Sequence, residues 1–423
     1  MSVILTGKDA GGTIAMHGSK SLSQRYILFS AFSGIPLLLH NRSFSDDEEI
    51  ALGIASECGS EVAVDADSIT VIPHFRCPDH LDVGESATSL RILLGLLTAK
   101  KCRTLIGMHS SLAARPHNDL LDTIREYGGR VDWAGEGTLS VDFSGITVLP
   151  YAISGSTSSQ FVSSVIMMNA LGSDQAEVKS SYVISSGGYI DLTKQVLADF
   201  GYEVVQDGEN FTIRKTGNPA KVEVHLEGDY SSASFLIVLG VLLSDQGIRI
   251  ENLAPDSGQP DAAFVRMLES AGASITREGN NIIVKRSRVG RVTIDVNQAP
   301  DLAPPGAVLG TFTRDGVTLR NCRRLEIKES DRLSSIITLA SSMGANVERD
   351  GNDVTVSAAP GERGEPAQAR DHRMVMSLAI SSVISGKRIR IGNEDTVSKS
   401  YRNFFSDLES LGIRVEHLKD KDI

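Results

Sequence analysis

Six apolar segments of helical length recur along the chain, and each follows a short polar opening rich in Gly, Ser or Asp. The segments 26–32 (YILFSAF) and 235–243 (FLIVLGVLL) are almost continuously apolar. A helix without a polar face belongs in a protein interior, so the pattern predicts buried helices with polar N-terminal ends. The openings lie near Gly18, Gly84, Gly155, Gly228, Pro300 and Asp371, roughly 70 residues apart, which is longer than the repeats of common solenoids.

The second half of each unit has a pattern of its own. Segments such as 50–64 (IALGIASECGSEVAV) and 404–418 (FFSDLESLGIRVEHL) place apolar residues at helical spacing, followed by a Gly and an alternating strand. A Gly in that place is typical of a helix C-cap. Six copies in the same order predict an α/β fold of two similar domains. Each domain contains three βαβαββ-type repeats, with sheets wrapped around buried helices.

Composition and charge narrow the class of protein. The chain has 423 residues, 41% of them hydrophobic and 22% charged, which fits a soluble globular protein too long for a single core. The formal net charge of −11 argues against a nucleic-acid partner. The apolar runs are too short and broken to span a membrane, and the N-terminus lacks the pattern of a signal peptide. We therefore expect a cytoplasmic protein with no membrane or nucleic-acid partner. We also expect a monomer, although composition and charge do not determine the oligomeric state.

The four cysteines carry no recognisable spacing. Cys58, Cys77, Cys102 and Cys322 do not pair as in a zinc site or a redox CxxC motif. We expect them to be free thiols in a reducing compartment and expect no metal site.

Basic residues gather at the polar openings. A helix N-terminus attracts anions, and arginine grips a carboxylate or phosphate with two parallel hydrogen bonds. Any one of these residues alone is most simply a solvated surface charge, but recurrence at equivalent points of a repeat favours binding of a small anionic ligand. The residues are Lys20, Arg25, Arg91, Arg115, Lys328, Arg332, Arg373 and Lys399.

The openings also carry a specific combination of motifs. In chain order they are GSKSLSQR (18–25), SGSTSSQF (154–161), GDYSSASF (228–235), IKESDR (327–332) and DHRM (371–374). This series resembles the motifs of the EPSP synthase family of enolpyruvyl transferases along the whole chain. The resemblance implies two inside-out α/β domains joined by two crossing strands near Gly18 and Gly228. One domain would contain residues 1–17 and 229–423, and the other residues 18–228.

The resemblance also implies an activity and its ligands. The family transfers the enolpyruvyl group of phosphoenolpyruvate to the 5-hydroxyl of shikimate 3-phosphate in the shikimate pathway of aromatic amino-acid biosynthesis, without a metal or other cofactor. The implied shikimate 3-phosphate residues are Lys20, Ser21, Arg25, Ser158, Ser159, Gln160, Ser186, Asp301, Arg324 and Lys328. The implied phosphoenolpyruvate residues are Lys20, Ala87, Arg115, Gln160, Arg332, Arg373 and Lys399.

Four residues receive catalytic roles from the resemblance. Asp301 is the candidate base for the 5-hydroxyl, and Glu329 is the candidate acid that protonates C3 of phosphoenolpyruvate. Lys20 would contact both substrates, and His372 would help to move protons as phosphate leaves. From the residues alone, a helix cap is the simpler interpretation of Asp301, and a surface ion pair is the simpler interpretation of Glu329.

Departures from the family pattern leave alternatives open. Glu85 stands where a neutral amide is usual, and Ala87 replaces a Gly that lines the phosphoenolpyruvate site. The family's inhibitor glyphosate occupies that site and is slightly longer than the substrate, so the Ala87 methyl group predicts reduced sensitivity. A UDP-N-acetylglucosamine enolpyruvyl transferase is a second interpretation, although its usual Cys is missing from residues 107–116 (GMHSSLAARP). A non-catalytic anion-binding relative is a third.

Overall fold

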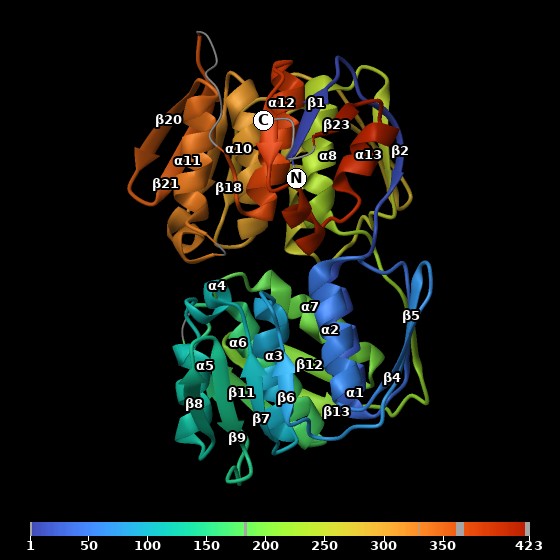
Figure 1. Cartoon of the computed structure of the whole chain (residues 1–423), viewed down its shortest axis with the longest axis vertical. Helices are drawn as coiled ribbons and strands as arrows, with labels where there is room; N and C mark the ends of the chain where they lie inside the picture. Colours follow the sequence, from blue (N-terminus) through green and yellow to red (C-terminus); the bar gives the residue numbers. More distant parts are fainter. Residues whose placement is uncertain (1, 182–183, 329, 361–367, 419–423) are drawn as a thin grey trace. The chain divides into compact units, whose positions relative to one another are not determined.

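The computed structural model describes residues 2–181, 184–328, 330–360 and 368–418. The chain forms two compact units: unit 1 contains Met1–His17 and Glu227–Ile423, and unit 2 contains Gly18–Leu226 (Figure 1). The chain therefore crosses between the units twice. The second crossing falls two residues earlier than the sequence suggested. Gly228 belongs to unit 1 because its backbone N–H bonds Asn252 O at 2.7 Å.

Three helices of unit 2 are buried on nearly every side, polar residues included. They are α1 (Lys20–Ser33), α3 (Ala87–Ala99) and α6 (Ser159–Gly172). The helices α2 (Asp46–Glu57), α5 (Asn118–Glu126) and α7 (Gly188–Asp199) each bury one side only, and α4 (Ser110–Ala113) is a single turn. The first group packs together inside unit 2, since α3 contacts both α1 and α6.

The sheets of unit 2 share one topology. The described strands form three four-stranded sheets in which the first two strands are parallel and the other neighbours antiparallel. One sheet runs β14 (Val222–His225), β3 (Leu37–His40), β5 (Ser68–Ile72), β4 (Glu61–Val64). The second runs β6 (His80–Asp82), β7 (Arg103–Gly107), β9 (Thr138–Asp142), β8 (Arg130–Gly135). The third runs β10 (Ala152–Ile153), β11 (Gln175–Ser180), β13 (Asn210–Lys215), β12 (Tyr202–Asp207).

Unit 1 repeats the plan. Its buried helices are α8 (Tyr230–Leu243), α10 (Ala303–Phe312) and α12 (His372–Ser385). Its one-sided helices are α9 (Ala263–Ser270), α11 (Arg332–Ser342) and α13 (Phe404–Ser410). Short 3₁₀ helices lie at η1 (Pro260–Ala262), η2 (Pro300–Leu302), η3 (Cys322–Ile327) and η4 (Glu394–Lys399).

The sheets of unit 1 use strands from both ends of the chain. One runs β16 (Ser274–Glu278), β17 (Asn281–Lys285), β15 (Gly247–Glu251), β2 (Gly11–Ala15). Another runs β18 (Val292–Asp295), β19 (Val317–Arg320), β21 (Asp353–Ala358), β20 (Ala345–Asp350). The last runs β22 (Arg390–Gly392), β1 (Ser2–Thr6), β23 (Arg414–Leu418). The blue N-terminal strands β1 and β2 thus lie among yellow and red elements in Figure 1. The predicted fold of buried helices surrounded by repeated small sheets is confirmed.

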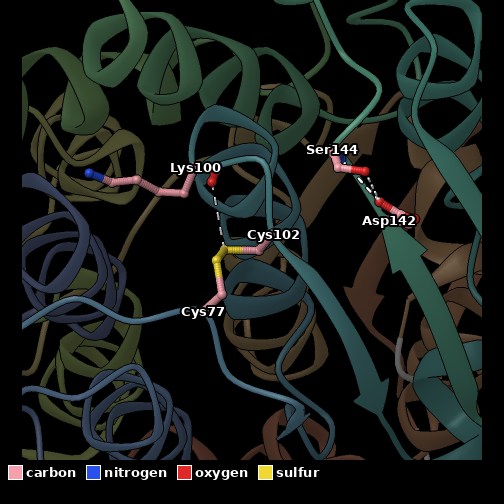
Figure 2. The surroundings of a disulfide bond; sticks show 5 residues. All are labelled: Cys77, Lys100, Cys102, Asp142 and Ser144. Atoms are coloured by element: carbon pink, nitrogen blue, oxygen red, sulfur yellow. Dashed lines mark hydrogen bonds between the residues drawn. A yellow bond between two sulfur atoms is a disulfide. The ribbon is translucent and has the colours of Figure 1, made fainter.

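The expectation of four free thiols is wrong for two of them. Cys77 and Cys102 form a disulfide, with Cα atoms 5.4 Å apart (Figure 2). Cys77 follows β5 and Cys102 precedes β7, so their closeness comes from the fold, and a separation of 25 residues gives no warning of it. Cys58 and Cys322 are free and buried, and burial raises the pKa of each thiol to about 12. Among the described helices, none is long and apolar enough to cross a membrane.

Candidate active site

The buried helices of unit 2 begin with neutral caps. Ser86 Oγ accepts a hydrogen bond from Ser89 N at the start of α3, and Ser158 Oγ accepts from Gln160 N at the start of α6. The cap of α1 is Ser19, whose hydroxyl makes no capping bond. Because a serine cap brings no negative charge, the positive dipole end of each helix remains available to an anion.

Arg25 is a buried cation whose hydrogen-bond partners are neutral. Its Nε donates to Thr193 Oγ1 at 3.0 Å, and its Nη1 donates to the Ser21 carbonyl oxygen at 2.7 Å. The residue is 1% exposed, and no carboxylate of the described chain forms an ion pair with it. Burial lowers the pKa of Arg25 to about 10. A buried charge without a counterion is unfavourable, so this guanidinium is suited to an incoming anion.

Arg91 connects the two loops in which site residues were predicted. Its Nη1 donates to Gln160 Oε1 at 2.7 Å and to Ser158 Oγ at 3.3 Å, while its Nη2 donates to the Pro116 carbonyl oxygen at 3.1 Å. Gln160 Nε2 in turn donates to Thr88 Oγ1 at 2.8 Å. Arg91 was noted among the basic residues of the openings but was not predicted as a site residue. Its position one turn into α3 was the available signal.

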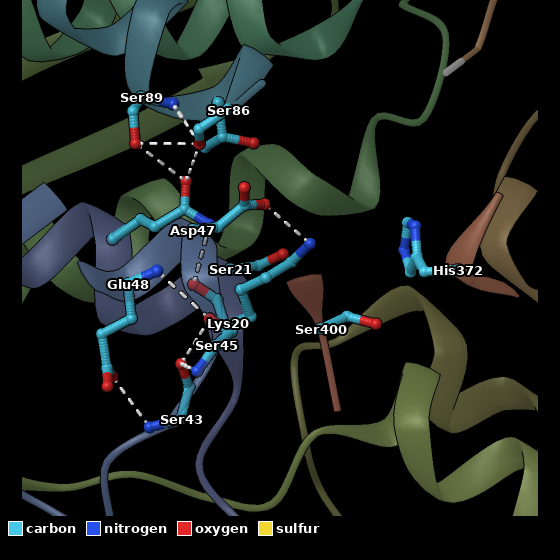
Figure 3. Close-up of polar contacts among 12 residues, drawn as sticks. Lys20, Ser21, Ser43, Ser45, Asp47, Glu48, Ser86, Ser89, His372 and Ser400 are labelled. Carbon is cyan, nitrogen blue, oxygen red and sulfur yellow. Dashed lines mark hydrogen bonds and ion pairs between the residues drawn. The ribbon is translucent and has the colours of Figure 1, made fainter. Parts of the chain in front are cut away.

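Lys20, the first residue of α1, pairs with an acidic residue of α2. Its Nζ lies 2.9 Å from Asp47 Oδ2, and Figure 3 shows the lysine side chain pointing toward that carboxylate. Next to Asp47, the fully buried Glu48 accepts hydrogen bonds from Ser43 N at 2.8 Å and from Arg42 Nε at 3.0 Å. Sequence reasoning missed both acidic residues, because an acidic first helical turn is usually a solvated one.

The remaining predicted residues of unit 2 lie at element starts. Ala87 begins α3 and is buried, and Ser159 begins α6. Ser186 lies just before α7 with a left-handed φ of 58°. Glu85 accepts a hydrogen bond from Ser111 Oγ at 2.6 Å and lies 3.9 Å from His109 Nδ1.

Aspartates occupy the corresponding helix starts of unit 1. Asp371 caps α12 and accepts from Arg332 Nη2 at 2.8 Å and Nε at 3.2 Å. Asp301, in η2, accepts from Arg332 Nη1 and from Arg373 Nη2, each at 3.0 Å. Both arginines are at least 95% buried, whereas the Asp301 side chain is 22% exposed. The fold therefore brings the predicted base together with two predicted phosphoenolpyruvate residues.

Nearby carboxylates stabilise the charged form of the Arg373 guanidinium. Burial acts to lower the pKa of its guanidinium, but Asp301, Asp261 and Asp229 outweigh that effect and raise it. Its Nη1 is buried and makes no hydrogen bond with any described residue. Both N–H groups of Nη1 thus remain available to another acceptor, which suits an anionic ligand.

The other predicted site residues of unit 1 that the structure describes lie at the start of α12 and in or next to η3 and η4. His372 is buried, with Nδ1 3.7 Å from Asp371 Oδ1. Arg324 Nη1 donates to the Asn297 carbonyl oxygen at 3.2 Å. Lys328 follows η3 and Lys399 ends η4. Glu329 lies outside the described residues. No group of three or more His, Cys, Asp or Glu residues that could hold a metal ion occurs in the described chain.

Comparison with known proteins identifies the fold and the family. A sequence model described as EPSP synthase (3-phosphoshikimate 1-carboxyvinyltransferase) matches residues 4–408. The 3-phosphoshikimate 1-carboxyvinyltransferase of Picrophilus torridus is 42% identical over 417 residues, which cover 97% of this chain and 99% of that protein. The protein of the same name from Thermoplasma volcanium is 35% identical and covers 99% of this chain and all of its own length.

Two solved structures share the fold at low identity. An EPSP synthase from Acinetobacter baumannii has a TM-score of 0.79 and 22% identity, covering 99% of this chain and 100% of its own. The enolpyruvyl transferase NikO from Streptomyces tendae has a TM-score of 0.77 and 19% identity, covering 99% and 98%. With the family match over nearly the whole length and the ordered site motifs, the conclusion is that this chain belongs to the EPSP synthase family.

Proposed function

We propose that this chain transfers the enolpyruvyl group of phosphoenolpyruvate to the 5-hydroxyl of shikimate 3-phosphate, giving 5-enolpyruvylshikimate 3-phosphate and phosphate. Membership of the family and the names of the full-length relatives support this reaction. The observation that carries it in this chain is Arg25, a buried cation with neutral partners only. An enzyme for a phosphorylated substrate has a use for such a charge, because the phosphate supplies the missing counterion.

The shikimate 3-phosphate site contains Arg25 and the neutral helix starts of unit 2. Ser158, Ser159 and Gln160 open α6, and Ser21 lies in the first turn of α1. Hydroxyl and backbone N–H groups at helix starts suit a phosphate. Lys20, Ser186, Asp301, Arg324 and Lys328 complete the proposed set.

Arginines dominate the phosphoenolpyruvate site. Arg332 and Arg373 are oriented by Asp371 and Asp301, so little side-chain freedom is lost when an anion binds. The unused Nη1 of Arg373 is one donor for the carboxylate or phosphate of the ligand. Arg115, Lys399, Lys20, Gln160 and Ala87 make up the rest of the proposed set.

Two carboxyl groups move the protons of the addition step. Asp301 takes the proton of the 5-hydroxyl, whose oxygen bonds C2 of phosphoenolpyruvate, while Glu329 protonates C3. Because Asp301 is held by Arg332 and Arg373, it becomes a better base when the anionic groups of phosphoenolpyruvate take up part of their positive charge.

The second step reverses the change at C3. The C2–O bond to phosphate breaks, the carboxylate of Glu329 takes a proton back from C3, and the C2–C3 double bond forms again. His372, beside Asp371, and Lys20 assist the departure of phosphate. No cofactor takes part in either step.

The setting of the reaction is part of the proposal. The substrates are phosphate esters that do not cross membranes unaided, so a cytoplasmic enzyme is proposed. A monomer is also proposed, and its oligomeric state is checked by size-exclusion chromatography with light scattering.

A phosphate-release assay tests the reaction. The purified chain receives phosphoenolpyruvate with shikimate 3-phosphate in one arm and with UDP-N-acetylglucosamine in the other. We expect phosphate release in the first arm only. Release only with UDP-N-acetylglucosamine would favour that transferase, and binding of shikimate 3-phosphate without release would favour a non-catalytic anion-binding relative.

A further inference from the structure

His117 closes the loop that carries Arg115. The loop runs from α4 to α5, and the side chain of His117 is buried, with 3% exposure. Its Nε2 bonds the Leu112 carbonyl oxygen at 2.8 Å, and the same oxygen accepts from Arg115 N at 3.1 Å. One carbonyl group therefore ties Arg115 and His117 together and fixes the turn between them.

Two further contacts anchor the same loop. The carbonyl oxygen of Pro116 accepts from Arg91 Nη2 at 3.1 Å, so Arg91 holds the residue between Arg115 and His117. In the first turn of α5, Asp119 Oδ2 accepts from Thr157 Oγ1 at 2.6 Å, next to the Ser158 cap of α6. The chain that follows Arg115 is thus held at Pro116 by a residue of α3 and at Asp119 by Thr157, which precedes α6.

The contacts of His117 determine the tautomer and the charge of its imidazole ring. A bond from Nε2 to a carbonyl oxygen requires Nε2 to carry the proton. Nδ1 then has a lone pair, and it makes no hydrogen bond with any described residue. Burial lowers the pKa of His117 to about 4, and the positive charges of Arg91 and Arg115 act in the same direction. The ring is therefore neutral at pH 7, with its donor committed to Leu112.

We propose that His117 is a positioning residue for phosphoenolpyruvate binding, acting by holding the Leu112–Pro116 turn so that Arg115 is preordered. The inference rests on the proposed function, in which Arg115 binds phosphoenolpyruvate. Preordering a cation lowers the entropic cost of binding its anion. Loss of the His117 anchor should therefore weaken phosphoenolpyruvate binding more than shikimate 3-phosphate binding, which depends on Arg25 and the α6 opening.

The substitutions compare loss of the donor with its retention. His117→Leu removes the N–H group and keeps an apolar side chain, whereas His117→Gln keeps an amide N–H group of similar reach. Thr123→Val is the matched control, because Thr123 Oγ1 donates to the Asp119 carbonyl oxygen at 2.8 Å within α5 and has no hydrogen bond to the described residues 112–117. A buried hydrogen bond of ordinary strength corresponds to a change of about 3- to 10-fold in an equilibrium constant.

The first readout needs no substrate. Amide hydrogen exchange of residues 112–117 should speed up in His117→Leu, recover at least partly in His117→Gln and remain unchanged in Thr123→Val. Unchanged exchange in His117→Leu would overturn the inference, whatever the enzyme does. This readout still decides the matter if the phosphate-release assay fails, so failure of the proposed function and failure of the inference can be told apart.

The second readout is steady-state kinetics. His117→Leu should raise KM for phosphoenolpyruvate about 3- to 10-fold, with kcat and KM for shikimate 3-phosphate within about 2-fold of the wild type. His117→Gln should restore much of the lost affinity. A fall in kcat with both KM values unchanged, or equal effects on the two substrates, would assign His117 a general structural role and overturn the proposal.

Discussion

Replacing Arg25 with methionine should stabilise the ligand-free protein while removing recognition of the phosphate. Burial lowers the pKa of Arg25 well below its ordinary value, to about 10, and each pKa unit corresponds to about 1.4 kcal/mol. The buried charge therefore costs the folded state about 3 kcal/mol at pH 7. Arg25→Met removes that cost and loses two hydrogen bonds to neutral groups, worth about 1 kcal/mol each. The net expectation is a gain of about 1–2 kcal/mol in the free energy of unfolding.

Urea unfolding with a local probe measures the effect. Trp133 is the only tryptophan of the chain and lies in β8 of unit 2, the unit that contains Arg25. The matched control is Arg42→Met in the same unit, since Arg42 is also buried but is paired with Glu48. That substitution leaves the buried carboxylate of Glu48 without its cationic partner and should destabilise the fold by about 3–5 kcal/mol.

The two variants should therefore shift the unfolding midpoint in opposite directions. Shikimate 3-phosphate should raise the midpoint of the wild type, because it binds the folded form, and should have little effect on Arg25→Met. Destabilisation of Arg25→Met to the same extent as Arg42→Met would refute the reasoning. It would mean that Arg25 already has a counterion or that its hydrogen bonds outweigh the cost of burying its charge.

Three further predictions concern single side chains. Glu48→Gln should lower the free energy of unfolding by at least about 2 kcal/mol in urea melts, because the carboxylate of Glu48 is buried. Glu49→Gln should change it by less than about 1 kcal/mol, because the carboxylate of Glu49 contacts the same Arg42 but is exposed, and equal effects of the two substitutions would contradict the assigned role of burial. Asp301→Ala should bind shikimate 3-phosphate measurably in calorimetry but lose a factor of about 10²–10⁴ in turnover, as should Glu329→Gln; near-native turnover in both variants would remove them as acid and base. Ala87→Gly should lower the inhibition constant of glyphosate, and an unchanged constant would rule out crowding by the buried Ala87 methyl group.

The core of the fold could be predicted because it follows from one simple pattern. Segment 235–243 has no polar face, so α8 had to be buried, and equivalent segments elsewhere had to share its role. The pairing of N-terminal strands with strands from the C-terminal part of the chain could not be predicted from such a pattern. Nothing in residues 2–6 indicates that β1 pairs with β22 and β23 near the other end of the chain.

The residue types of the candidate site could be predicted from the sequence, but which cations are paired with carboxylates could not. The sequence placed cations at both sets of helix openings and treated them alike. In the structure Arg332 is neutralised by Asp371 and Asp301, whereas Arg25 has neutral partners only. Asp371 and Asp301 lie 39 and 31 residues from Arg332, so these pairings depend on tertiary packing. The same holds for Lys20 and Asp47, which are 27 residues apart.

The central claim is that Arg25 is the counter-charge for the phosphate of the substrate. Calorimetric titration of shikimate 3-phosphate and of shikimate, which lacks the phosphate, into the wild type and Arg25→Gln tests it most directly. We expect the wild type to prefer the phosphorylated ligand strongly, and Arg25→Gln to lose a factor of roughly 10–100 of that preference, as for a charged hydrogen bond worth about 1.5–3 kcal/mol. Binding of shikimate itself should change little. An identical preference in the two proteins would contradict the claim.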